Sequence, residues 1–275
     1  MLTLGLLQMT TPRISASSYS NTAPLIWSFL YGANHGKVEL VLDNAPARSA
    51  ELLANGRVDA ALVPVIAYHQ LDDVKLVSDV CVGAKEQVRS VCLVTRGEDL
   101  TDVRSVALDV SSRTSVVLTK IIFREFLGSE PDWCNSAPNI ETMLASADCA
   151  LLIGDPALKL SDLDDGRAGL RTFDLARLWK HYTDLGFIFA MWMTRNGRSA
   201  IDFAAARDEG LAHIDAIVSN YAPEIKVGED AMRTYLSQNI SYSVSDDLQR
   251  GMELYFALAK NHGLCENIRQ LEYAK

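Results

Sequence analysis

Hydrogen-bond donors crowd into one short turn between an apolar run and an apolar helical pattern. Four hydroxyls and a guanidinium occupy five consecutive positions: Ser111, Ser112, Arg113, Thr114 and Ser115. The first turn of a helix leaves about four backbone N–H groups unpaired and carries a partial positive charge, so it attracts carboxylates and phosphates. The pattern therefore predicts a binding site for a small anion. A plain helix cap is the alternative explanation, although one hydroxyl would suffice for it.

Three further polar segments are candidates for the same site. They are a turn with Ser18, Tyr19, Asn21 and Thr22, a strand end with Gly154 and Asp155, and Arg89-Ser90, where the chain is expected to pass between lobes. In an open α/β sheet, ligands bind beyond the carboxyl ends of the strands. We therefore expect these segments to surround one crevice. For Asn21 and Thr22, a helix cap is an equally good explanation.

The motifs of common catalytic machinery are absent from the sequence. It contains no P-loop, no nucleophile elbow and no dinucleotide-binding glycine pattern. The five cysteines are scattered without a C-x-x-C pair, and the five histidines lack metal-ligand spacing, so neither a metal nor a cofactor is expected. Asp109 and Asp155 are the best acidic candidates, and each could simply orient a turn. The residues alone indicate a protein that closes on a small anion.

Composition narrows the class of partner. The chain has 275 residues, of which 48% are hydrophobic, and a formal net charge of −9. An acidic surface argues against nucleic acid or an anionic membrane as the main partner. No run approaches the ~20 apolar residues of a membrane span. The apolar stretch of residues 1–9 is short and has no basic residue ahead of it, so we expect a cytoplasmic protein and not a secreted one.

Strands and helices alternate along most of the chain. Strands are expected at 13–19, 37–42, 58–65, 88–95, 103–110, 149–153 and 187–193, with helices at 22–31, 46–55 and 114–127. This alternation is typical of βαβ units and a mostly parallel sheet. Beyond residue 201 the pattern changes to three amphipathic helices. We expect two lobes, one formed by residues 1–92 plus 190–275 and the other by residues 93–189.

An internal similarity bears on the relation between the lobes. The segment Glu51–Pro64 and the segment Glu141–Gly154 both read as a helix, then Asp-x-Ala-Leu, then the end of a buried strand. Two unrelated helix–strand units could look alike by chance. The alternative is that the two lobes are built in the same way and face each other.

Several motifs occur together in one order and spacing. They are Ser18-Tyr19-Ser20-Asn21-Thr22-Ala23-Pro24-Leu25, Gly56-Arg57-Val58-Asp59-Ala60-Ala61-Leu62-Val63-Pro64, Arg89-Ser90-Val91, Ser112-Arg113-Thr114-Ser115-Val116, Ala150-Leu151-Leu152-Ile153-Gly154-Asp155-Pro156-Ala157-Leu158 and Asp174-Leu175-x-x-Leu178-Trp179. In this combination the chain resembles the chorismate dehydratase family of the futalosine route to menaquinone. The resemblance runs from about Arg13 to Arg195. Two positions depart from the family pattern: Ser20 replaces a bulky aliphatic residue, and Asp184-Leu185-Gly186 replaces Gly-Leu-Pro.

The resemblance carries expectations about fold and reaction. It implies an α/β fold of the type II periplasmic-binding-protein kind, with a ligand cleft between the lobes and a helical C-terminal region. It implies a carbon–oxygen lyase that converts chorismate to 3-[(1-carboxyvinyl)oxy]benzoate and water without a cofactor. Loss of the C3 proton and the C4 hydroxyl makes the ring aromatic, so the enzyme needs mainly to orient the substrate, stabilise charge and exclude water. The substrate's own enolpyruvyl carboxylate is a candidate base.

The same resemblance assigns roles to the candidate residues. Asn21 and Ser90 are the expected catalytic residues, with Asn21 bonded to the ring hydroxyl or its leaving water. The expected substrate-binding residues are Ser18, Tyr19, Thr22, Ser112, Arg113, Thr114, Ser115, Gly154, Asp155 and Trp179. Tyr19 and Trp179 would shape the ring pocket, and Arg113 would supply a counter-charge. The alternatives are a non-catalytic binding protein for a small carboxylate ligand and the sister dihydroxynaphthoate synthase activity. The protein could be a monomer or a homodimer.

Overall fold

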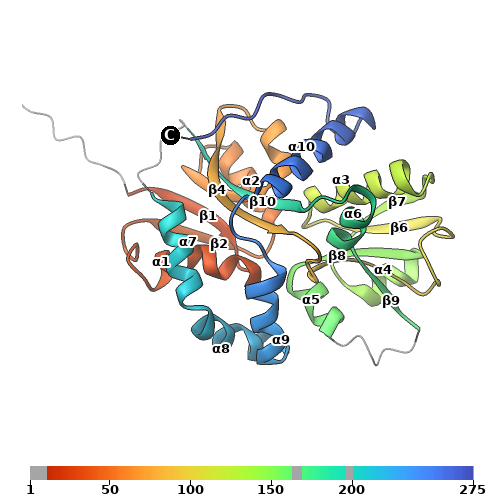
Figure 1. Ribbon diagram of the computed structural model, residues 1–275, viewed down its shortest axis with the longest axis horizontal. Helices are drawn as coiled ribbons and strands as arrows, with labels where there is room; N and C mark the ends of the chain where they lie inside the picture. Colours follow the sequence, from red (N-terminus) through yellow and green to blue (C-terminus); the bar gives the residue numbers. More distant parts are fainter. Residues whose placement is uncertain (1–10, 163–168, 196–200, 275) are drawn as a thin grey trace, which may run out of the picture.

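A computed structural model describes residues 11–162, 169–195 and 201–274 of the chain. Its strands form two five-stranded sheets (Figure 1). The first sheet has the order β2-β1-β3-β10-β4 and contains β1 (Arg13–Ser17), β2 (Glu39–Asp43), β3 (Ala60–Pro64), β4 (Val74–Ala84) and β10 (Phe187–Arg195). The second has the order β7-β6-β8-β5-β9 and contains β5 (Val91–Thr95), β6 (Ser105–Asp109), β7 (Asp132–Ser136), β8 (Cys149–Ile153) and β9 (Arg171–Asp174).

Helices flank both sheets. Those within the alternating part of the chain are α1 (Ala23–Leu30), α2 (Pro46–Ala54), α3 (Thr114–Ile121), α4 (Ile140–Ser146), α5 (Gly154–Asp162) and α6 (Leu175–Thr183). The C-terminal part contains α7 (Phe203–Ala212), α8 (Ile214–Ile225), α9 (Glu229–Thr234) and α10 (Asp246–Asn261). Short 3-10 helices cover Ser20–Thr22 and Val65–His69, and π-helical turns extend α3 over Ile122–Phe126 and α9 over Tyr235–Asn239. The described helices lack the combination of length and apolar character needed to cross a bilayer.

The two sheets share one topology. In the first sheet only β10 runs against the other strands, and in the second only β5 does, so each sheet is mostly parallel as the sequence predicts. The helix–strand units of the internal similarity end in β3 and β8, and each of these strands is third in its sheet. The topology therefore supports two similarly built lobes over a chance likeness. We call the part built on the first sheet the first lobe and the part built on the second sheet the second lobe.

The boundaries of the lobes lie where the chain changes sheets. The first sheet takes its strands from residues 13–84 and 187–195, and the second takes its strands from residues 91–174. The chain thus crosses once between β4 and β5 and once between β9 and β10. The division into 1–92 plus 190–275 and 93–189 stays a prediction. The strand bounds place Val91 in the second sheet and Phe187 in the first.

Some strands and helices of the structure were not predicted from the sequence. Strands β4, β7 and β9 are not among the expected ones, and each lies at an edge of its sheet. Strands β7 and β9 are short and carry polar side chains, and Ser78-Asp79 interrupts the apolar pattern of β4, so none of the three shows the continuous apolar run that marks a central strand. The prediction of three C-terminal helices was wrong as well, because the described part of that region contains four. Its last helix begins at Asp246, with the Ser245 hydroxyl accepting from the Leu248 N–H.

An aromatic cluster joins the two lobes behind the cleft. Trp179 of α6 is fully buried and packs edge-on against Phe187 of β10, with 5.4 Å between ring centroids. Phe187 in turn meets Tyr255 of α10 at 5.0 Å. The Tyr255 hydroxyl donates to the carbonyl of Thr114, at the start of α3. Helix α10 therefore lies against elements of both lobes (Figure 1).

Candidate active site

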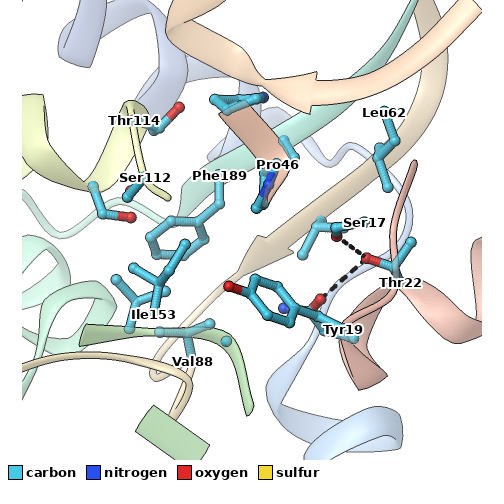
Figure 2. Close-up of a pocket in the computed structure, with 17 residues that line it drawn as sticks. Ser17, Tyr19, Thr22, Pro46, Leu62, Val88, Ser112, Thr114, Ile153 and Phe189 are labelled. Atoms are coloured by element: carbon cyan, nitrogen blue, oxygen red, sulfur yellow. Dashed lines mark hydrogen bonds between the residues drawn. The ribbon is translucent and has the colours of Figure 1, made fainter. Parts of the chain in front are cut away.

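A pocket lies between the lobes at the carboxyl ends of strands β1, β3 and β8 and of the turn after β6. The space between its walls, including its open mouth, is about 580 Å³. The first lobe contributes polar lining residues Ser17, Tyr19, Asn21 and Thr22, and the second contributes Ser112, Thr114 and Ser115. Two turns that the sequence singles out thus meet across one cleft, as predicted (Figure 2).

Helix starts, and no ionised side chains, surround the described part of this pocket. Among the described lining residues, none is Asp, Glu, Lys, Arg or His. Four helices begin at its wall: α1 follows Thr22, α2 starts at Pro46, α3 at Thr114 and α5 at Gly154. Helix starts carry partial positive charge and unpaired N–H groups. The arrangement favours an anion held by hydroxyls and helix starts, without an ionised partner.

The turn after β1 is organised by its own side chains. Ser17 and Thr22 hydroxyl oxygens lie 2.9 Å apart, and Thr22 Oγ1 donates to Asn21 Oδ1 at 3.3 Å (Figure 2). These two hydrogen bonds fix the carbonyl end of the Asn21 amide. Ser18 is outside the described lining, and its backbone N–H donates to the carbonyl of Asp43.

The turn after β6 is braced by a buried carboxylate. Asp109 is fully buried, and its Oδ1 accepts from the Ser111 N–H at 2.9 Å and the Ser111 hydroxyl at 2.5 Å. Its Oδ2 accepts from the Ile153 N–H at 3.3 Å. Burial raises the pKa of Asp109, and these hydrogen bonds oppose the rise. Ser111 is thus bonded within the chain, while Ser112, Thr114 and Ser115 line the pocket.

Gly154 lets the second lobe approach the ring of Tyr19. Its φ of +68° lies in the left-handed region, which glycine adopts without strain. A Cβ at this position would lie 2.6 Å from two atoms of the Tyr19 ring. Figure 2 shows the Tyr19 hydroxyl directed toward Phe189 and Ile153. Burial raises the pKa of the Tyr19 phenol.

Asp155 joins the lobes and does not line the pocket. Its Oδ1 accepts from the Ser20 N–H at 3.1 Å and from the Ser20 hydroxyl at 2.5 Å. Burial raises the pKa of Asp155, with a smaller contribution from the charge of Glu224. The contact joins residues that lie 135 positions apart, and no local pattern near either of them indicates it.

Arg113 lies at the edge of the cleft. Its Nη2 is 3.7 Å from Glu51 Oε1 of α2, and its side chain is 32% exposed. It is not among the described lining residues. The expected counter-charge therefore forms an ion pair between the lobes, and the hydroxyls beside it face the pocket.

Ser90 and Trp179 are both fully buried outside the described lining. The Ser90 carbonyl accepts from the Gly154 N–H at 2.7 Å, which places Ser90 directly behind the pocket wall. Trp179 donates through Nε1 to the carbonyl of Gly186 at 3.1 Å. Its position in the aromatic cluster gives it a role in joining the lobes, and it is not among the described residues that line the pocket.

Apolar residues complete the pocket, and the sequence did not single them out. Phe189 of β10 lies between the Tyr19 side and the Ser112 side of the cavity (Figure 2). Leu62 and Pro46 cover the wall of the first lobe. Each belongs to an element that the sequence predicts, but periodicity does not tell which apolar residues of a buried strand face a cleft. In residues 11–162, 169–195 and 201–274, no group of three acidic, histidine or cysteine side chains could hold a metal ion.

Solved structures with this architecture include periplasmic binding proteins. Protein AF1704 from Archaeoglobus fulgidus has a TM-score of 0.71 at 16% identity, covering 92% of this chain and 98% of that one. The periplasmic aliphatic sulphonate binding protein SsuA from Escherichia coli has a TM-score of 0.62 at 15% identity, covering 96% and 93%. The Candida albicans CA3427 gene product, described as having the generic periplasmic binding protein fold, scores 0.59 at 13% identity, covering 96% and 98%. The likeness confirms the expected fold.

Comparison of sequences identifies the family, which the likeness of folds does not. A chorismate dehydratase from Thermus thermophilus is 31% identical over 260 residues, which cover 86% of this chain and 91% of that protein. The sequence model of a family described as menaquinone biosynthesis matches residues 12–261. That match spans both lobes and most of the helical region. The chain belongs to the menaquinone biosynthesis family.

Proposed function

We propose that this protein is a chorismate dehydratase, a carbon–oxygen lyase that acts on chorismate in the cytoplasm. Family membership and the similarity to the Thermus thermophilus enzyme support the proposal. The observation that carries it is the pocket itself. Hydroxyls, one amide and four helix starts surround an apolar floor, and no ionisable side chain except the Tyr19 phenol is among its described lining residues. Such a site suits a dianion that supplies its own base.

The dehydration of chorismate needs little from the protein beyond correct placement of the substrate. The C3–H bond of chorismate breaks, its electron pair forms the new ring double bond, and the C4–O bond breaks. The departing hydroxide and the C3 proton leave as water, and the product is 3-[(1-carboxyvinyl)oxy]benzoate. Because the enolpyruvyl carboxylate can take the proton, the protein's task is to hold both carboxylates, spread developing charge and exclude water.

The two lobes divide this task. Ser112, Thr114 and Ser115 at the start of α3 hold a carboxylate, with the helix dipole stabilising charge that develops on it. From the opposite lobe, the Asn21 amide donates to the leaving hydroxyl. Tyr19 and Phe189 enclose the ring and keep water out. Ser90 acts from directly behind the pocket wall, where its carbonyl accepts from the Gly154 N–H.

The test is incubation of the purified full-length chain with chorismate. We expect an aromatic ultraviolet spectrum and a product lighter than chorismate by one water. Asn21→Ala should lower kcat by about 100-fold or more, the size of effect seen when one donor to a developing charge is removed. Asn135→Ala, which changes an exposed asparagine on edge strand β7, is the control and should keep wild-type turnover.

Each other outcome has a definite meaning. Tight binding of chorismate without turnover would replace the enzyme by a binding protein for a small carboxylate. Unchanged chorismate with no binding would reject the substrate. Near-wild-type turnover by a folded Asn21→Ala variant would remove Asn21 from the mechanism.

A further inference from the structure

A buried tyrosine lies behind the pocket wall, on the helical C-terminal region. Tyr235 begins the π-helical turn that follows α9, and π-helical turns occur frequently at functional sites. Tyr235 and Ser90 are both fully buried. Neither the Tyr235 hydroxyl nor the Ser90 hydroxyl completes a hydrogen bond of normal geometry with another described residue. Two such hydroxyls in one place require an explanation, because an unpaired buried hydroxyl costs stability.

The surroundings of the phenol connect it to the pocket. The Tyr235 hydroxyl lies beside the Ser90 hydroxyl and the Asn21 amide. Burial raises the pKa of Tyr235, and both neighbours oppose that rise. Thr22 Oγ1 engages the carbonyl oxygen of Asn21, so the NH₂ group is the end of the amide that is left to meet the Tyr235 oxygen.

The two ends of the Asn21 amide are thus held from opposite sides. Its carbonyl oxygen accepts from Thr22 Oγ1 at 3.3 Å, and Thr22 is bonded to Ser17 on the pocket wall. With that oxygen engaged, the NH₂ end is the one left for Tyr235. A line of polar side chains runs from the cavity through Asn21 to the buried phenol. This line determines the orientation of the amide.

The fold alone does not need the phenol oxygen. A phenylalanine at position 235 would fill the same volume without burying an unpaired hydroxyl, and an unpaired buried hydroxyl carries a desolvation penalty. The oxygen contributes a neighbour for Asn21 and Ser90, and these are the two residues to which the resemblance assigns catalysis.

We propose that Tyr235 is a positioning residue of the active site, which holds the Asn21 amide and the Ser90 hydroxyl in the orientation that the dehydration requires. This inference rests on the proposed function of the same site. Tyr235 acts through Asn21, so it does not touch substrate. Its removal should slow the chemical step and leave substrate affinity nearly unchanged.

Tyr235→Phe tests the proposal because it deletes one buried oxygen and keeps the ring. We expect Tm to stay equal or rise, kcat to fall by about tenfold or more, and KM to change less than about threefold. In an Asn21→Ala background, Tyr235→Phe should have little further effect, since the two residues act as a unit. A tenfold loss of kcat appearing independently in that background would contradict a role through Asn21.

Tyr242→Phe is the matched control. The Tyr242 hydroxyl is also buried without a hydrogen-bond partner among the described residues, and its polar neighbours are Tyr235 and Cys81. We expect its kcat to stay within about twofold of wild type. A Tyr235→Phe variant with wild-type kcat, or an equal loss in Tyr242→Phe, would overturn the proposal.

A second measurement separates this inference from the proposed function. The side-chain amide signals of Asn21 in a ¹⁵N–¹H spectrum are assigned by their loss in Asn21→Ala. They should shift in Tyr235→Phe and stay in place in Tyr242→Phe, whether or not the wild type turns over chorismate. Unshifted Asn21 signals would reject the positioning role, and an inactive wild type would reject only the proposed function.

Discussion

At the scale of single residues, the hydroxyls of the two donor-rich turns divide between two tasks. Ser111 bonds to the buried Asp109, and Ser17 pairs with Thr22, so these groups hold the turns in shape. Others, such as Ser112 and Ser115, line the cavity, and no Asp, Glu, Lys, Arg or His is among its described lining residues. A neutral pocket avoids burying a cation that would have to be desolvated. Affinity for an anion then comes from donors that the backbone has already oriented.

Gly154→Ala tests how closely the lobes must approach. The new Cβ would collide with the Tyr19 ring and the residue would be strained at φ +68°. Gly128→Ala is the control, because Gly128 has φ +63° but no heavy atom within 4 Å of the new Cβ. Left-handed strain should cost each variant about 1–2 kcal/mol in urea unfolding. Only Gly154→Ala should lose turnover, by about tenfold or more, since a small misplacement of binding groups is costly.

Equal activities in the two variants would mean that the Tyr19–Gly154 contact does not matter for the reaction. A loss in Gly128→Ala alone would be incompatible with the geometry of the pocket.

At the scale of elements, one carboxylate sets both the start of α6 and the crossing between lobes. Asp174 Oδ1 accepts from the Arg177 N–H at 3.0 Å and caps the helix. Its Oδ2 accepts from the N–H groups of Val88 at 3.0 Å and Arg89 at 2.6 Å. Arg89 has a φ of +60°, which is uncommon for a residue with a side chain. The segment that carries Ser90 is therefore fixed by hydrogen bonds to a helix of the second lobe.

Asp174→Ala should destabilise the protein more than the loss of an ordinary cap. We expect about 2–4 kcal/mol from urea unfolding, because the cap is lost and two further N–H groups become unpaired. Asp202→Ala is the comparison, since among the described residues Asp202 caps α7 through the Ala205 N–H, and it should cost about 1 kcal/mol. Equal losses would show that the crossing segment does not depend on Asp174.

At the scale of the whole molecule, the active site exists only while the lobes touch. Ser20 bonds to Asp155, the Ile66 N–H donates to Thr114 Oγ1 at 3.4 Å, and Arg113 approaches Glu51. The exposed ion pair contributes little, on the order of 0–1 kcal/mol. The buried contacts and the aromatic cluster around Trp179 therefore determine how the lobes are held together.

The Ser20–Asp155 contact predicts a pH dependence. Burial raises the pKa of Asp155 above its ordinary 3.8, so the folded protein binds the proton more tightly than the unfolded chain does. The contribution of this side chain to stability is then largest below pH 3.8 and declines as pH rises through the raised pKa. We expect the free energy of unfolding of wild type, relative to Asp155→Asn, to fall as pH increases above 3.8.

Asp99→Asn should show the opposite slope. Hydrogen bonds from Thr101 lower the pKa of Asp99, so its stabilisation is present above pH 3.8 and is lost as pH falls through the lowered pKa. Urea unfolding over a series of pH values checks both slopes. A wild-type advantage over Asp155→Asn that grows with pH would contradict the assigned environment.

Much of this protein follows from local sequence. The central strands, the helix starts and the hydroxyl-rich turn after β6 depend on residues that are close together along the chain. Apolar periodicity and helix-capping preferences therefore predict them. The match between Glu51–Pro64 and Glu141–Gly154 also indicated similarly built lobes. Residue types therefore determined the fold class, two polar turns and the absence of familiar catalytic motifs.

Only tertiary structure decided which of those donors meet the cavity. Ser20 and Asp155 are 135 positions apart, and nothing near either residue indicates the contact. The same holds for Arg113, which lies against Glu51, for Trp179, which joins the lobes, and for Tyr235, which lies behind Asn21. The physical reason is that side-chain direction depends on how distant elements pack, whereas the start of a helix depends on its immediate neighbours.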